Sequence, residues 1–324
     1  MKPVSKFIKL FGAGALALGG LFASGAIQAQ EKYPSRPIEI IVPWGPGGGA
    51  DQLARKVGKI MEDSMKVSFP VVNAPGATGS TGMTKLLVGQ ADGHAISVFI
   101  ADTHALQVTG NTKWKSGTDF KPLAIMLQQP SAIFVPNDSR FKTWADFEKE
   151  AKANPGKLKV AVLGLGSIDD VTLRYLGTKG IKTNAVPFSN PGERYVSILG
   201  GHADALYEQA GDVRQMLDNK QMRPLLIFAN ERVPEFKDIP VSKELGYNVT
   251  LPQFRSLIIK AGTPPERVKL LADAIAKAAA SPEYKAFLKD SYADSNSYLG
   301  PAEAEKFLQH ELDAMSALVT SLGK

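Results

Sequence analysis

The chain has 324 residues, with 38 basic and 32 acidic side chains, a formal net charge of +6 and no cysteine. Its basic residues are interspersed with acidic ones, which argues against a nucleic-acid-binding groove and leaves a mild positive bias that suits small acidic ligands. The lack of cysteine excludes disulfides, thiolate metal sites and a lipoprotein anchor.

The first 29 residues have the three-part form of a secretory signal. Three lysines precede an apolar run, and small residues around Ala29 predict cleavage after that residue. The run is short and rich in glycine, unlike a membrane span. We therefore expect a soluble exported protein of 295 residues, long enough for two domains of about 150 residues each.

A strand, a glycine loop and a helix follow one another at the start of this protein. Residues 38–42 (IEIIV) have the pattern of a buried strand, residues 43–49 (PWGPGGG) form the loop, and a helix is expected from near Asp51. A helix N-terminus behind such a loop presents free backbone N–H groups and a positive dipole end, which predicts an anion site. Strands expected at 69–72 and 95–100 end at the same sheet edge.

A second series of strands and helices begins near residue 129. A strand expected at 158–163 is followed by Gly164, Gly166 and Ser167 and then by a helix, which repeats the first arrangement. The chain returns to the first unit at a strand over 254–260 and ends in three helices. The pattern predicts an α/β protein with two crossings near residues 128 and 250. Residues 30–128 and 251–324 would form the first domain, and residues 129–250 the second, with a ligand cleft between them.

Several segments resemble the Bug family of periplasmic solute receptors, which serve tripartite tricarboxylate transporters. They include YPSRPIEIIVPWGPGGGADQLAR at 33–55, VVNAPGATGSTG at 71–82, LGGHADA at 199–205 and AGTPPERV at 261–268. The resemblance implies a two-domain periplasmic-binding-protein type II fold, or Venus flytrap, which closes on a small organic carboxylate. It also implies membrane permease subunits as partners, and we expect a monomer without a cofactor.

The resemblance further implies that one ligand carboxylate is held between the two glycine loops. The matching residues are Gly47, Gly48, Gly49 and Asp51 in the first loop and Gly166 and Ser167 in the second. Here the chain also departs from the family, because Ile168, Asp169 and Asp170 stand where many members have Ser/Thr and His. Acidic residues in the first turn of a helix are ordinarily capping residues. The alternative is that one of these carboxylates faces the cleft and accepts a hydrogen bond from a ligand amine or hydroxyl.

Further candidates come from single residues in unusual places. Arg255 lies in an otherwise apolar strand and needs a partner, either a ligand carboxylate or an internal acid. Trp44 precedes the first glycine loop and either packs over the ligand or belongs to the core. Polar residues at strand ends and in loops complete the predicted site. They are Asn73, Thr81, Asp102, Thr103, Gln209 and Gln253.

A di- or tricarboxylate is the ligand we expect first. An aromatic carboxylate stacked on Trp44 or Phe188 is the second candidate, and an amino acid whose ammonium meets Asp169 or Asp170 is the third. The competing class of protein is an exported enzyme that acts on a carboxylated or phosphorylated metabolite. The sequence has no metal-ligand spacing among its four histidines, no G-x-S-x-G and no dinucleotide or P-loop motif, so we expect a binding protein and not an enzyme.

Overall fold

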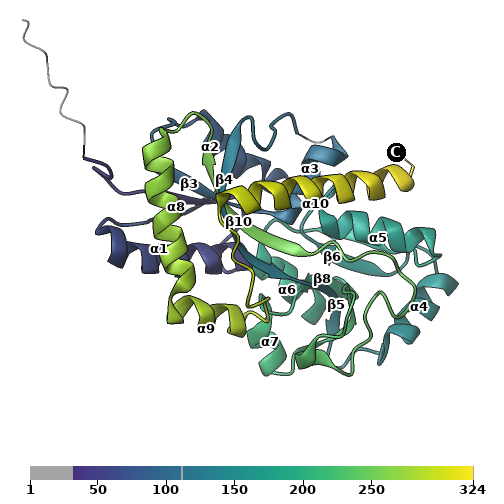
Figure 1. Cartoon of the computed structure of the whole chain (residues 1–324). Coiled ribbons are helices and arrows are strands. Elements are labelled where there is room, and N and C mark those ends of the chain that lie inside the picture. The colour runs from purple at the N-terminus through teal and green to yellow at the C-terminus, as the bar shows by residue number, and fades with distance from the viewer. Residues whose placement is uncertain (1–31, 111, 324) are drawn as a thin grey trace, which may run out of the picture. The chain divides into compact units, whose positions relative to one another are not determined.

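Two five-stranded sheets organise the described residues (Figure 1). The structure is a computed structural model that describes residues 32–110 and 112–323, so the predicted signal peptide and its cleavage site lie outside the described residues. The first sheet has the strand order β2-β1-β3-β10-β4 and the second has β7-β6-β8-β5-β9. The strands of the first sheet are β1 (Glu39–Val42), β2 (Val71–Asn73), β3 (Ala95–Ile100), β4 (Phe120–Gln129) and β10 (Gln253–Lys260). Those of the second are β5 (Ser131–Pro136), β6 (Lys159–Val162), β7 (Asn184–Pro187), β8 (Ala205–Gln209) and β9 (Met222–Ile227).

The two sheets have the same topology. In each, the first three strands of the order are parallel, and the fourth, β10 or β5, runs antiparallel to both of its neighbours. Parallel strands bring their C-terminal ends to one edge, so each sheet presents a set of strand–helix loops there. The fold therefore places two similar loop edges in one molecule.

Helices cover both sheets. Those of the first sheet are α1 (Gly49–Met65), α2 (Ser80–Val88), α3 (Ala101–Thr109), α8 (Pro265–Ala280), α9 (Pro282–Asp290) and α10 (Pro301–Ser321). Those of the second are α4 (Trp144–Ala153), α5 (Ile168–Thr178), α6 (Pro191–Leu199) and α7 (Arg214–Asp218), and two short 3-10 turns lie at Ala77–Gly79 and Pro234–Phe236. We call each sheet with its helices a lobe, the first and the second. None of the described helices is both long and apolar enough to cross a bilayer.

The chain passes between the lobes at two neighbouring points. Strand β4 ends at Gln129 and β5 begins at Ser131, while β10 begins at Gln253 after the excursion through the second lobe. Gln253 pairs with Gln129, so the two crossings lie side by side. The division into domains at 128 and 250 stays a prediction, because the residues from Tyr33 onward form one compact unit.

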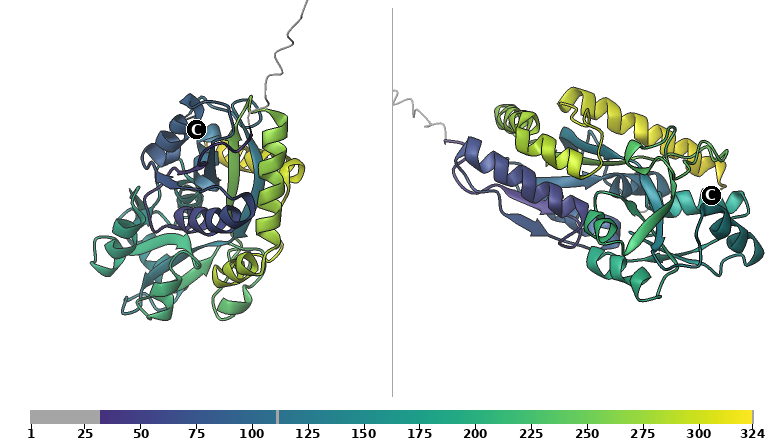
Figure 2. Two further views of the ribbon diagram at one scale, coloured as in Figure 1. Left: turned by 90° about the vertical axis from the view of Figure 1, so that its left-hand side faces the viewer. Right: turned by 90° about the horizontal axis from the view of Figure 1, so that it is seen from below.

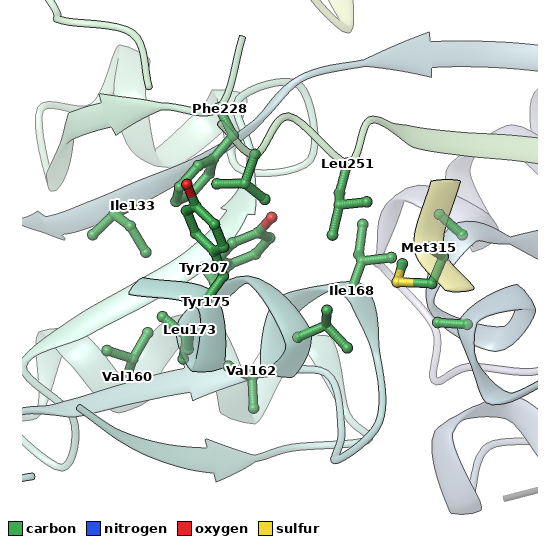
Figure 3. Close-up of a cluster of buried hydrophobic side chains, with 14 of the residues drawn as sticks. Ile133, Val160, Val162, Ile168, Leu173, Tyr175, Tyr207, Phe228, Leu251 and Met315 are labelled. Atoms are coloured by element: carbon green, nitrogen blue, oxygen red, sulfur yellow. The ribbon is translucent and has the colours of Figure 1, made fainter. Parts of the chain in front are cut away.

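The C-terminal helices complete the first lobe. Helices α8 and α9 contact α1, and α10 contacts β4 and α3 (Figures 1 and 2). The far end of α10 also reaches the second lobe, because Met315 shares a buried cluster with Ile168 of α5 and with Leu251 beside the second crossing (Figure 3). One helix thus packs against both lobes.

Gly82 offers a test of how tightly α2 packs on the segment leading to the first glycine loop. A Cβ at this position would lie 2.6 Å from Pro43 Cα, closer than real side chains approach a backbone. We expect Gly82→Ala to lower the free energy of unfolding by about 1–3 kcal/mol, measured by urea denaturation. Gly192→Ala is the matched control, since its nearest foreign atom would be 3.5 Å away. Equal stability of the two variants would contradict this account of the packing.

Candidate functional site

The first glycine loop is held in shape by Asp51. Its carboxylate accepts hydrogen bonds from the Gly47 backbone N–H and from Asn73 Nδ2, both at 3.0 Å, and it forms a two-point ion pair with Arg55. Burial alone would raise the pKa of Asp51, but the bonds from Arg55, Gly47 and Asn73 hold that pKa below its usual value. Asp51 and Asn73 therefore position the loop, and their polar groups are already engaged.

The N-terminus of α1 points at a cavity between the lobes. No side chain of the described residues caps this helix, whose N-cap is Gly48. The first N–H groups of a helix have no acceptor within it, and here Gly49 and Ala50 supply them. Both residues line the cavity, as does the side chain of Trp44, which is 2% exposed. The positive end of the α1 dipole consequently faces the cavity, as expected for an anion site.

The opposite wall is formed by α6 and the end of β8. Its lining residues are Pro191, Arg194, Tyr195, Glu208, Gln209 and Asp212. Of these, only Gln209 was predicted from the sequence. The Asn-Pro start of α6 signalled a helix at 190–191, but nothing local indicated that this helix would pack on the first glycine loop.

The two walls are closed on each other. A Cβ at Gly48 would lie 2.6 Å from Pro191 Cγ, and one at Gly45 would lie 3.1 Å from Pro191 Cδ. The cavity that remains has a volume of about 20 Å³, enough for roughly one water molecule. A ligand of any size can enter only when the lobes separate.

The second glycine loop lies elsewhere than predicted. Gly164 packs against Thr78 of the first lobe, and Thr78 Oγ1 donates to the Leu165 carbonyl at 3.4 Å. The first glycine loop meets Pro191 and not this loop, so the expectation of two glycine loops facing one another across the cleft needs correction. The physical reason is that Pro191 of α6 covers the first loop, whereas Thr78 of the first lobe covers Gly164 of the second.

Three predicted residues of the second loop do not line the cavity. The Gly166 N–H donates to Asp170 Oδ2 at 3.0 Å, and the buried Ser167 hydroxyl accepts from the Asp170 backbone N–H as the cap of α5. Ile168 points into the apolar cluster that contains Met315 (Figure 3). Asp170 thus takes part in the hydrogen bonds at the start of α5, as the ordinary interpretation of the acidic pair expects.

Thr81 is exposed on α2 and does not line the cavity either. Thr103 is fully buried beside Gly79, and its Oγ1 has no hydrogen-bond partner among the described residues.

An ion pair joins the lobes across the cavity. Arg255 of β10 binds Asp212 of the second lobe, and both side chains are buried. A Cβ at Gly49 would collide with both groups, so the ion pair lies against the first residue of α1. Burial works to lower the pKa of Arg255, but the adjacent Asp212 raises it above its usual value. Arg255 therefore has an internal acid as its partner in this closed arrangement.

Asp102 and Asp169 face one another from opposite lobes. Asp102 accepts from Gln253 Nε2 at 2.6 Å, and Asp169 accepts from the Leu163 backbone N–H at 2.8 Å. Both aspartates are at most 1% exposed, and their side chains come within hydrogen-bonding reach of each other. Burial raises the pKa of both, and the neighbouring Asp102 raises that of Asp169 further.

A second buried ion pair lies beside these aspartates. Arg194 binds Glu208, and its Nη1 lies 3.9 Å from Asp169 Oδ2. Burial raises the pKa of Glu208 to about 7 despite the favourable charge of Arg194. Among the described residues, four carboxyl groups and two guanidinium groups are thus buried between the lobes. Fully ionised, they would carry two excess negative charges.

We also considered a metal site and a larger cavity as alternative functional sites. The described residues contain no group of three or more His, Asp or Glu side chains that could hold a metal ion. A cavity of about 870 Å³ lies beside the crossings, with 128–130 and 292–295 in its lining, but it is open and borders neither glycine loop.

Comparison with known proteins identifies the family of this chain. Residues 53–324 match the family model described as "TctC: Tripartite tricarboxylate transporter family receptor". The chain belongs to this receptor family.

Individual relatives agree with that assignment. The receptor is 29% identical to the UPF0065 protein in the tcbD-tcbE intergenic region of Pseudomonas sp. strain P51, over 85% of this chain and 83% of that protein. It is 28% identical to Protein BugT of Bordetella pertussis, over 79% of this chain and 81% of BugT. The predicted membership of the Bug family is confirmed.

The fold is also that of a solved receptor. The structure of MatC from Rhodopseudomonas palustris with bound malate matches with a TM-score of 0.81 and 23% identity, over 89% of this chain and all of MatC. This likeness confirms the predicted α/β, two-domain periplasmic-binding-protein fold.

The pKa of Glu208 predicts a pH dependence of stability in the ligand-free receptor. Its folded pKa of about 7 exceeds the ordinary value of 4.5, so the folded state binds the proton more tightly than the unfolded state. The free energy of unfolding should therefore fall as the pH rises from about 4.5 to about 7.

We expect Glu208→Gln to reduce this fall and to be more stable than the native chain near pH 7.5 by about 1 kcal/mol or more, measured by urea denaturation. Glu305→Gln, at an exposed position, is the control and should follow the native curve. A Glu208→Gln curve parallel to the native one would contradict the assignment.

Proposed function

We propose that the receptor captures a small organic carboxylate between its lobes and delivers it to the permease subunits of a tripartite tricarboxylate-type transporter. One observation carries the proposal. The Arg255 guanidinium and its partner carboxylate, that of Asp212, lie together against Gly49 at the uncapped N-terminus of α1. A site that holds an internal carboxylate in this way is suited to the carboxylate of a ligand.

Binding is proposed to proceed by opening and closure. The lobes separate at the two neighbouring crossings, the ligand carboxylate takes the place of Asp212 beside Arg255, and α6 closes over the first glycine loop. Malate bound to MatC, a protein of the same fold, supports a dicarboxylate as the ligand class. Di- or tricarboxylates therefore remain our first candidates.

The family membership supports a proposal for the location of the protein. Receptors of this family are periplasmic, and we propose export with signal cleavage after Ala29 and a monomeric receptor in the periplasm.

We propose no catalytic step. The charged groups that line the cavity are engaged in ion pairs, and catalysis would need a nucleophile or general base free to reach a substrate. His104 is not such a base, because its ring bonds Leu308 and Gln107 and its burial lowers its pKa to about 4. An exported enzyme acting on the same acids is the alternative.

A thermal-shift screen of organic acids on the purified protein tests the function. We expect one or a few small carboxylates to raise the melting temperature by several degrees, because a ligand that binds only the folded state stabilises it. The acid should be recovered unchanged after incubation. Conversion of the stabilising acid would favour the enzyme, and failure of every carboxylate to stabilise the protein would reject the proposal.

Gly48→Ala tests closure. Its Cβ would overlap Pro191 in the closed arrangement, whereas the backbone of Gly48, with φ −79°, accommodates alanine. We expect about tenfold weaker binding of the acid found in the screen, measured by calorimetry, because the added methyl group hinders closure of α6 on the loop. Gly192→Ala, on the same helix as Pro191 but without a close contact, should bind normally. Unchanged affinity of Gly48→Ala would show that closure of α6 on this loop is not needed.

A further inference from the structure

The buried Asp102–Asp169 pair has a missing partner. Oδ1 of each aspartate lacks a donor among the described residues, although both atoms are buried. Two carboxyl groups within hydrogen-bonding reach need a proton or a cation between them, because like charges at that distance repel strongly in a dry interior. The Trp44 Nε1 and Thr103 Oγ1 atoms, also buried, lack partners as well. Unsatisfied polar atoms on both lobes indicate that the closed arrangement is complete only with a ligand.

The protein supplies no full counter-charge to this pair. Arg194 is the cation nearest to Asp169 in the part of the chain that is described, but its Nη1 stands 3.9 Å away and its closer partner is Glu208. The other groups around the pair are Gln253 of β10 and Tyr207 and Glu208 of β8, none of them cationic. Both aspartates also stand in the first turns of helices, α3 and α5, whose dipoles favour a negative charge there.

We infer that Asp102 and Asp169 form a subsite for a protonated amine, so that the ligand of this receptor carries an ammonium group as well as a carboxylate. The inference deepens the proposed function and rests on it. Closure would bring one aspartate from each lobe onto the ammonium, which offers donors to the two free Oδ1 atoms. The ligand would thereby replace the proton that the empty pair requires.

The spacing of the two subsites fits a small molecule. Gln253, which holds Asp102, and Arg255 lie two residues apart on β10 and both line the cavity. Residues at i and i+2 of a strand share a face and are separated by about 7 Å. A ligand with its carboxylate at Arg255 and its ammonium near Asp102 therefore has the size of an amino acid with a carboxylate on its side chain or of a short ω-amino acid.

Matched pairs of acids test the subsite. The probes are aspartate against malate, glutamate against 2-hydroxyglutarate, and 4-aminobutyrate against 4-hydroxybutyrate, each measured by calorimetry on the purified protein. We expect the amine of the best-fitting pair to bind about 10- to 100-fold more tightly than its hydroxyl analogue, the range of a hydrogen bond to a charged group. Asp169→Asn and Asp102→Asn should remove most of this preference and retain the hydroxy acid.

The control is Asp170→Asn, in the same turn of α5, whose carboxylate bonds the Gly166 backbone and should leave the preference unchanged. A second measurement uses only the native chain, so its result does not depend on whether a variant folds. In buffers of different ionisation enthalpy, amine binding should release more protons than hydroxy-acid binding, because the ammonium displaces the proton of the pair.

Three outcomes separate the two proposals. Preference for the amine, lost in Asp169→Asn or Asp102→Asn, supports the subsite. Equal or tighter binding of the hydroxy acids with equal proton release overturns the subsite and leaves the proposed function intact. Absence of binding by any acid of either kind overturns both.

Discussion

An excess of buried carboxyl groups over guanidinium groups dominates the interior between the lobes. Asp102, Asp169, Glu208 and Asp212 share this space with Arg194 and Arg255. Removing several like charges from water is costly unless each is paired, and two guanidinium groups neutralise only two acids. Without a ligand, the closed arrangement therefore needs protons on some of these carboxyl groups to reduce the excess negative charge. A ligand with a positive charge would reduce that excess in their place. Net charge over the whole chain, mildly positive, gives no hint of this local imbalance.

The topology explains why so many charges meet at one place. Each lobe turns the C-terminal edge of its parallel strands toward the other, so residues just after β3, β6 and β8 converge. The two crossings lie side by side through the pairing of Gln253 with Gln129, and the segment after α9 joins them, since the Asp294 N–H donates to the Gln128 carbonyl at 2.9 Å. In the proposed opening and closure, the lobes would pivot at these crossings.

Sequence patterns were sufficient for the fold and for one wall of the site. Periodicity, glycine loops and capping spacing located the strands, because those signals are local. Arg194, Glu208 and Asp212 were missed because each lies in a segment with an ordinary pattern, and only tertiary packing brings it to the cavity. Ile168 and Ser167 were misplaced for the opposite reason. A glycine loop at a helix start signals exposed backbone but does not say which neighbour will cover it, and here α10 and the Asp170 side chain do so.

The first glycine loop still has the features of an anion site, but charged side chains beside it also affect which ligand it can bind. Helix α1 offers its N-terminus to a carboxylate, and in the closed protein Asp212 already lies there beside Arg255. In the proposed binding mode, a ligand carboxylate displaces an internal carboxylate of the same charge, so this end of the cleft provides little net electrostatic gain for a simple anion. Discrimination between ligands is then left to the other end, where Asp102 and Asp169 have unsatisfied oxygens. In the proposed binding mode, recognition of the acid and selection of its second functional group are thereby assigned to two different places between the lobes.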